Sequence, residues 1–330
     1  MLPIKILSMA TALPEAVLAT SIDKKLNLPA GSVEKMGGVR KRHFAQNEKQ
    51  STLAAQAVLA ALAKAGLSLN DVDALVAACG VPEQAIPCTA VLVARELNIQ
   101  EKHGIACFDF NATCLSFMVA LDALAAQITV KRFRTVVLVS ADFASRGIDW
   151  SHMESACIFG DGVVAAILQF DESNQSYVIA SHVVTLPEGW AACQISAGGT
   201  EVNPRTRNDD LNERDFLFQM DGKAIFKLAA QHIPKALEQF WQRTGLTMGD
   251  IDWVVPHQAS HLGMHHVRKL LKIDESKTID IYSEYGNQVA ASMPTALYEG
   301  IEQGKIKRGD TVLLIGTGAG LTIGLTAFKY

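Results

Sequence analysis

Three residues of different types could share one reaction: a cysteine, a histidine and an asparagine. Cys114 follows a short strand-like stretch (residues 108–113, FDFNAT) and precedes apolar residues at helical spacing. We therefore expect it at a strand-to-helix turn, where the helix dipole and unpaired N–H groups would stabilise a thiolate. The alternative is a buried structural thiol, which is the usual state of an isolated cysteine.

The histidine and the asparagine occupy similar places farther along the chain. His257 follows a predicted buried strand (residues 252–256, DWVVP), and Asn287 enters a predicted helix in the stretch YGNQVAASMP. Alone, each has a plainer interpretation, as a surface or core histidine and as a turn or cap asparagine. A glycine turn (residues 316–320, GTGAG) follows another predicted buried strand, and its backbone N–H groups could hold an oxyanion.

The elements that must position these residues come in two copies. Residues 66–76 (GLSLNDVDALV) resemble residues 245–255 (GLTMGDIDWVV), and a second matching pair lies near residues 120–135 and 296–311. Helices alternating with short apolar strands favour an α/β fold, and their repetition favours two fused copies of one unit over chance similarity. We place the boundary between halves 1–172, carrying the cysteine, and 173–330, carrying the histidine and asparagine. Residues 198–214 are predicted to form a long surface loop.

Composition excludes several classes of protein. The 330 residues are 49% hydrophobic and 19% charged, with a formal net charge of -4, which favours a compact globular protein without attraction to nucleic acid. No apolar run is long enough to cross a bilayer, and the N-terminus lacks a secretory pattern. The six cysteines form no CxxC pair. We therefore expect a cytoplasmic protein with free thiols and no membrane partner.

A cluster of histidines raises the question of a metal. His257, His261 and His265 recur every four residues, but no HExxH motif is present and His257 is expected to precede the helix, so we predict no metal site. Basic residues follow them on the same predicted helix: Arg268, Lys269 and Lys272. They form either a surface that attracts an acidic partner or a solvated face without a partner.

In order, spacing and context these motifs resemble the β-ketoacyl-acyl-carrier-protein synthase III family, the initiating condensing enzymes of the thiolase superfamily. The resemblance covers almost the whole chain and includes residues 38–43 (GVRKRH), 159–162 (FGDG), 220–227 (MDGKAIFK) and 256–259 (PHQA). It implies a thiolase-like α/β fold in which two duplicated halves form a layered α-β-α-β-α architecture. It also implies a homodimer.

The resemblance also implies a role for each site residue. Cys114 would take an acyl group from acyl-coenzyme A or an acyl carrier protein. His257 and Asn287 would hydrogen-bond the thioester carbonyl of malonyl-acyl carrier protein and stabilise the enolate formed as carbon dioxide leaves. The backbone N–H groups of Cys114 and Ala319 would form a second oxyanion hole. No cofactor beyond these substrates is implied, and an aspartate in place of Asn287 would repel the enolate.

Five positions depart from the family pattern. Ser32, Met36 and Leu262 replace residues that clamp the adenine of coenzyme A, so the first carrier is either a carrier protein or a nucleotide bound differently. Thr317 replaces a phenylalanine beside the malonyl site, which leaves open a related acyltransferase or Claisen synthase of secondary metabolism. Ile86 replaces the phenylalanine that gates the partner subunit's acyl pocket, and it either admits a longer chain or simply repacks.

A member of a different class is the remaining alternative. The chain could be a silent partner subunit that only completes a heterodimer. Such partners tend to lose the three site residues, whereas this chain keeps all of them.

Overall fold

The computed structural model describes residues 1–205 and 211–330, apart from the side chain of Lys102. Residues 206–210 of the predicted surface loop therefore lie outside the described residues. The helices in the described part are α1 (Ala19–Lys25), α2 (Ser32–Gly37), α3 (Gln50–Ala65), α4 (Thr89–Glu96), α5 (Ser116–Thr129), α6 (Met153–Ala156), α7 (Gly222–Thr244), α8 (His261–Leu271), α9 (Tyr282–Tyr285) and α10 (Ser292–Glu302).

Two mixed sheets form the frame of the molecule. The first has five strands in the order β1 (Ile4–Thr11), β7 (Asp161–Phe170), β6 (Thr135–Phe143), β4 (Ala74–Ala77) and β5 (Ala106–Asp109). The second has four in the order β11 (Trp253–Pro256), β12 (Thr311–Gly318), β13 (Thr322–Lys329) and β8 (Tyr177–Thr185). Within them β4 runs parallel to β5 and β6, and β11 runs parallel to β12.

The remaining strands are short and lie outside the two large sheets. β2 (Ala16–Leu18) pairs with β3 (Lys41–His43), and β9 (Cys193–Gln194) pairs with β10 (Gln219–Met220). Helices α1 and α2 lie between the two strands of the first pair, and the second pair precedes α7. None of the helices in the described ranges is long and apolar enough to cross a membrane.

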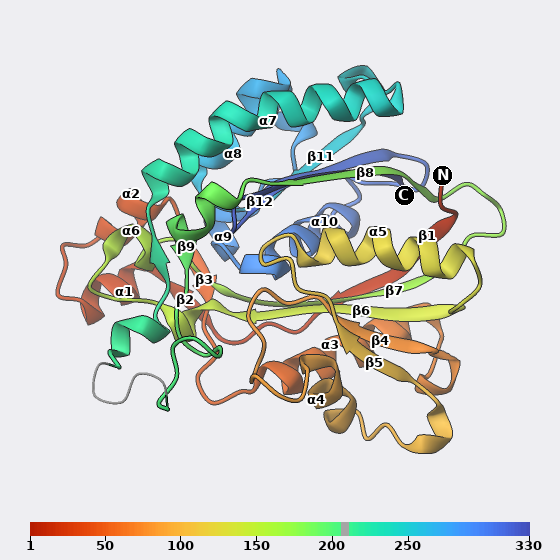
Figure 1. Cartoon of the computed structure of the whole chain (residues 1–330), viewed down its shortest axis with the longest axis horizontal. Helices are drawn as coiled ribbons and strands as arrows, with labels where there is room; N and C mark the ends of the chain where they lie inside the picture. The colour runs from red at the N-terminus through yellow and green to blue at the C-terminus, as the bar shows by residue number, and fades with distance from the viewer. Residues whose placement is uncertain (206–210) are drawn as a thin grey trace.

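The layers are visible in Figure 1. Helices α3 and α4 cover the outer face of the first sheet, α7 and α8 cover that of the second, and α5 and α10 lie between the sheets. The sequence of α5 (SFMVALDALAAQIT) is apolar almost all round, as expected for a helix enclosed on every side. The α-β-α-β-α architecture expected of a thiolase-like fold is therefore confirmed.

The central helices join the two halves of the chain in one core. Leu115 and Leu121, at the start and in the middle of α5, are buried together with Val255, Met293 and Leu314 from the second half. Burial of this kind contributes on the order of 1.5–3 kcal/mol for each large aliphatic side chain. The interface between the halves is thus part of the hydrophobic core, and the residues at the edge of this interface pack against that core.

The sequence repeat recurs as a repeat of local structure. In the first half the N–H of Ser68 donates to Asp71 Oδ2 at 2.8 Å, and in the second the N–H of Thr247 donates to Asp250 Oδ2 at 2.8 Å. Both bonds belong to capping boxes on single 3-10 turns, Leu69–Asp71 and Met248–Asp250, which lead into β4 and β11. The same short motif therefore introduces the corresponding strand in each half.

A second pair of carboxylates ties each of these strands to its parallel neighbour. Asp73 accepts from the N–H of Thr135 at 3.0 Å, and Asp252 accepts from the N–H of Thr311 at 2.8 Å. In return, each aspartate donates its own N–H to the carbonyl of the same threonine at 2.9 Å. The large sheets draw on residues 4–170 and 177–329 respectively, whereas the division at residue 172 remains a prediction.

Candidate active site

Cys114 lies at the turn between β5 and α5, as the sequence predicts. Ser116, the first residue of α5, closes this turn: its Oγ accepts from the N–H of Ala112 at 2.9 Å and donates to the carbonyl of Thr113 at 2.6 Å. Thr113 adopts a left-handed backbone with φ of 52°. A β-branched residue rarely adopts this conformation, so the turn that presents the cysteine is strained.

Burial outweighs the stabilisation of the thiolate that was expected from the start of the helix. Burial of the thiol raises the pKa of Cys114 well above its ordinary value, and Cys193 and Asp142 raise this pKa further. The backbone N–H groups of Ala319 and Cys114 lower the same pKa, but by less than burial raises it. Desolvation exceeds the contribution of the local dipoles, so the resting side chain is a neutral thiol.

The glycine turn after β12 lies directly against the cysteine turn. A Cβ on Gly318 would lie 2.7 Å from Thr113 Oγ1 and 3.2 Å from the carbonyl oxygen of Ala112, so only glycine allows this approach. The next residue, Ala319, is the one whose N–H acts on the Cys114 thiol. The structure therefore brings together the two residues whose N–H groups were expected to form an oxyanion hole. Thr317 lies beside them on β12 and is partly buried.

His257 follows the last residue of β11 and is buried. Its N–H donates to the carbonyl of Ile315 at 2.8 Å, which extends the pairing of β11 with β12. A Cβ on Gly316 would lie 2.6 Å from His257 Cβ and 3.3 Å from Leu115 Cδ2, so this glycine sits between the histidine and the residue after the cysteine. Burial lowers the pKa of His257 to about 4, and its Nδ1 has no partner among the described residues. The imidazole is therefore neutral at physiological pH.

Asn287 is held through both its backbone and its side chain. Its N–H donates to Ile158 at 2.7 Å and its carbonyl accepts from Gly160 at 3.0 Å, so it pairs with the stretch that ends in the FGDG motif. The amide oxygen accepts from the N–H of Val289 at 2.9 Å, while Nδ2 donates to the carbonyl of Ala259 at 3.3 Å. These bonds fix the amide with its nitrogen toward the segment that carries His257.

Four of the sequence-predicted site residues thus lie on segments that contact one another around the Cys114 turn: Cys114, His257, Asn287 and Ala319. Others lie on the surface. Ile86 is 86% exposed and Leu262 is 72% exposed, as fits residues that were expected to contact a partner subunit and a carrier. Ser32 and Met36 begin and nearly end α2, and Met36 is 53% exposed.

The predicted basic face on α8 is only partly correct. Lys269 and Lys272 are exposed. The Arg268 side chain is 12% exposed and forms ion pairs with Glu275 at 3.0 Å and Asp280 at 3.4 Å, so its charge is already used within the chain. His261 begins α8, and His257 precedes the helix as expected. Within residues 1–205 and 211–330 no group of three or more histidines, cysteines or acids could hold a metal.

Two residues near the nucleophile were missed by the sequence analysis. Asp142, close to the end of β6, and Cys193, in β9, both raise the pKa of Cys114. Burial raises the pKa of Asp142 to about 7 and that of Cys193 to about 11. The only sequence signal for Asp142 is a carboxylate inside an otherwise apolar strand (TVVLVSADF), which indicates a buried charge but not its neighbours.

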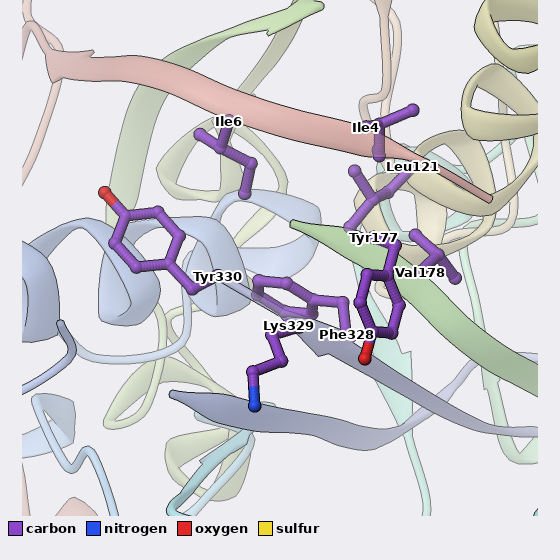
Figure 2. Close-up of a pocket in the computed structure, with 8 residues that line it drawn as sticks. All are labelled: Ile4, Ile6, Leu121, Tyr177, Val178, Phe328, Lys329 and Tyr330. Atoms are coloured by element: carbon purple, nitrogen blue, oxygen red, sulfur yellow. The ribbon is translucent and has the colours of Figure 1, made fainter. Parts of the chain in front are cut away.

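Two hollows lie in the surface, one far from Cys114 and one beside the segment that pairs with Asn287. Figure 2 shows a small pocket enclosed by residues of β1, α5, β8 and the end of β13, with Phe328 and Tyr330 on its wall. It lies at the opposite end of the β12–β13 hairpin from Gly318 and is separate from the cysteine. A second hollow lies beside Phe218, whose ring packs edge-on against Phe159 at 4.6 Å, next to the strand segment that pairs with Asn287.

The fold and the site together define the class of thiolase-fold condensing enzymes. Family models agree: the model described as 3-oxoacyl-[acyl-carrier-protein (ACP)] synthase III matches residues 108–187, and the model of its C-terminal part matches residues 241–330. The chain therefore belongs to the β-ketoacyl-acyl-carrier-protein synthase III family, and it is a condensing acyltransferase.

Similar proteins span the full length of the chain. The β-ketoacyl-[acyl-carrier-protein] synthase III of Clostridium tetani is 31% identical, over 99% of this chain and 98% of the relative. The corresponding enzyme of Neisseria gonorrhoeae is 33% identical, over 89% and 88%. The crystal structure of 3-oxoacyl-(acyl carrier protein) synthase III from Pseudomonas aeruginosa PAO1 has a TM-score of 0.88 at 28% identity, covering 99% of this chain and 98% of that one.

Proposed function

We propose that this chain joins an acyl group held on Cys114 to a malonyl unit carried by an acyl carrier protein, with loss of carbon dioxide. One observation supports this most: two neutral, buried donor groups, His257 and Asn287, lie on segments that pack around the Cys114 turn. His257 is uncharged because burial lowers its pKa to about 4, and the oxygen of the Asn287 amide is occupied, which leaves its nitrogen as a donor. Such donors stabilise an enolate without requiring a metal.

In the first step Cys114 Sγ attacks the carbonyl carbon of the incoming thioester. The negative charge that develops on the carbonyl oxygen is stabilised by the N–H groups of Cys114 and Ala319. The carrier leaves as its thiol, which takes up the proton of the Cys114 thiol, so that the step is balanced. In the free chain the same two N–H groups lower the pKa of the thiol, although burial raises this pKa by more.

In the second step the malonyl thioester loses its carboxylate as carbon dioxide, and the remaining electron pair forms an enolate. His257 and Asn287 donate hydrogen bonds to the enolate oxygen. The carbanion attacks the acyl group on Cys114, a β-ketoacyl thioester forms, and the released thiolate takes a proton from solvent. His257 and Asn287 are both neutral hydrogen-bond donors to the developing negative charge. Substitution of either should therefore lower kcat by a factor of about 10²–10³, the range for loss of one oxyanion-hole donor.

The surface of the chain favours an acyl carrier protein as the first carrier too. At the positions of the family's nucleotide clamp stand Ser32, Met36 and Leu262, and the last two expose apolar side chains in place of cations. Lys269 on α8 and Lys272 just after it remain exposed nearby to attract an acidic carrier. We further propose a cytoplasmic homodimer in which Ile86 reaches the partner's acyl pocket. All six cysteines are free, as a reducing compartment requires.

One feature supports a second candidate function. Thr317 is small and polar where the family carries phenylalanine beside the malonyl site, so the decarboxylation step has lost an apolar neighbour. A Claisen synthase or acyltransferase that uses the same three residues without decarboxylation is this second candidate. Release of carbon dioxide in step with product formation separates the two.

Intact-protein mass spectrometry tests the proposal directly. The enzyme is incubated with acyl-coenzyme A and acyl-carrier-protein thioesters of increasing chain length, and malonyl-acyl carrier protein is then added. We expect an acyl adduct on Cys114 that malonyl carrier discharges with release of carbon dioxide, and no adduct on the Cys114→Ala variant. An adduct that malonyl carrier leaves intact would refute condensation and favour the second candidate. No adduct from any donor would favour the silent partner subunit.

A further inference from the structure

Asp142 is a carboxylate with no exposed surface, placed behind the cysteine turn. Its Oδ1 accepts from the N–H of Gly80 at 2.8 Å and from the N–H of Val81 at 2.9 Å. Its Oδ2 has no hydrogen-bond partner among the described residues, while the N–H groups of Ala290 and Ala291 lie close enough to the carboxylate to lower its pKa. One side chain therefore contacts the loop of the first half and the turn that follows Asn287 in the second.

Gly80 is the point at which these segments meet. A Cβ built on it would collide with Val289 Cγ1 and would lie 3.4 Å from Asp142 Oδ1 and 3.5 Å from the carbonyl carbon of Thr113. The loop that Asp142 holds is therefore in contact with the residue before Cys114 on one side. On the other side it contacts the 3-10 turn Val289–Ala291, which begins two residues after Asn287.

The two residues pressed against Gly80 are both strained. Thr113 has φ of 52° and Val289 has φ of 54°, a left-handed backbone that costs a β-branched residue about 1–3 kcal/mol. Such strain persists only where the surroundings hold it in place. The N–H of Val289 also donates to the amide oxygen of Asn287 at 2.9 Å, so the strain at Val289 is coupled to the orientation of that amide.

We propose that Asp142 is a positioning residue: as a carboxylate it holds loop 80–81 between the Cys114 turn and the Asn287 turn, and so sets the separation of those two side chains. It does not contact the reacting atoms. Burial disfavours the charged form of Asp142 and raises its pKa to about 7, and its bonds to Gly80 and Val81 compensate in part. The expected effect on the condensation rate rests on the proposed function.

The test compares Asp142→Asn with a matched control, Asp171→Asn. Asp171 is also a buried carboxylate, and its Oδ2 accepts from the N–H groups of Gln175 and Ser176 at 2.8 Å, but it lies at the far end of β7 from the site. For Asp142→Asn we expect kcat for condensation to fall by about tenfold or more, because the reacting side chains are misplaced. The KM for malonyl carrier should change by less than about twofold, because the substrate still binds. Asp171→Asn should change neither.

A second readout does not depend on turnover. The charge of Asp142 raises the pKa of the Cys114 thiol, and Cys193 is the other titratable group that does so. Asp142→Asn should therefore make Cys114 react faster with iodoacetamide at each pH, while the control should not. The alkylated peptide must be identified, because Asp142 also raises the pKa of Cys79.

The outcomes are distinct. If Asp142→Asn condenses and alkylates as the wild type does, or as Asp171→Asn does, the inference is wrong. If the wild type does not condense at all but the alkylation rates differ as expected, the proposed function fails and the placement of Asp142 stands. If Asp142→Asn is insoluble, Val289→Ala removes the contact with Gly80 but keeps the N–H that binds Asn287, and unchanged kcat in that variant would overturn the inference.

Discussion

At the scale of single residues, the Cys114 thiol is subject to opposing influences. Burial and two neighbouring acidic groups raise its pKa, whereas the N–H groups of Ala319 and Cys114 lower it. The thiol therefore rests in its protonated form, which reacts slowly with oxidants and alkylating agents. Formation of the thiolate is favoured only when a thioester occupies the site and its carrier can take the proton.

The pH dependence of stability follows from His257. Burial lowers its pKa from 6.5 to about 4, so between these values the unfolded chain binds a proton that the folded chain does not. The free energy of unfolding should therefore fall as the pH decreases through this range, with up to about 3 kcal/mol lost from this residue. Urea unfolding of the wild type and of His257→Gln at a series of pH values measures it. If the free energy of unfolding falls equally in the two proteins as the pH decreases, the loss does not come from His257.

The sequence predicted the residues that carry the proposed chemistry but not those around them. Cys114, His257 and Asn287 each follow or precede a recognisable strand or helix, so their placement at converging strand ends could be predicted. Asp142 could not, because its neighbours Gly80 and Ala290 are distant in sequence and are brought together only by packing of the two halves. The raised pKa of Cys114 was missed for the same reason, since it depends on burial by residues of the second half.

At the scale of elements, the β11–β12 pair controls where the histidine stands. Gly316→Ala would place a Cβ 2.6 Å from His257 Cβ, a distance that real side chains do not reach. The variant should lose about 1–3 kcal/mol of stability through overpacking, and its kcat should fall because His257 must move. Gly199→Ala is the matched control, since its Cβ meets nothing within 4 Å. Thermal unfolding and condensation assays measure both, and wild-type activity in Gly316→Ala would refute this role of the glycine.

The order and type of these elements could be read in advance, and their close contacts could not. The predicted buried strand that leads into the glycine turn is β12, and the predicted helix after Cys114 is α5. The contact of Gly318 with Thr113 depends on the packing of a hairpin from one half on a turn from the other. Pattern and propensity describe single segments, so they carry no information about such contacts.

At the scale of the whole molecule, the proposed homodimer with Ile86 at the partner's acyl pocket predicts that acyl selection is shared between subunits. Ile86 is 86% exposed on its own chain. An Ile86→Trp homodimer should accept shorter acyl groups than the wild type. In a mixed dimer, one subunit carries Ile86→Trp with an intact Cys114, and the other carries Cys114→Ala with an intact Ile86. The one remaining Cys114 should then face the intact Ile86 of the other subunit, so longer acyl groups should again be accepted. Mass spectrometry of the acyl adducts measures the chain lengths that each dimer accepts. If the mixed dimer still accepts only short acyl groups, the gate acts within one chain.

The shared position of the four site residues has a consequence for protein synthesis. Cys114 is translated early, but the N–H of Ala319 that acts on its thiol belongs to the hairpin of β12 and β13, which is translated last of the described elements. A nascent chain on the ribosome therefore carries Cys114 without the Ala319 N–H that we propose stabilises the oxyanion of a bound thioester. Acyl carriers in the cell should not label such partial chains, and the first acylation event should report a completed fold.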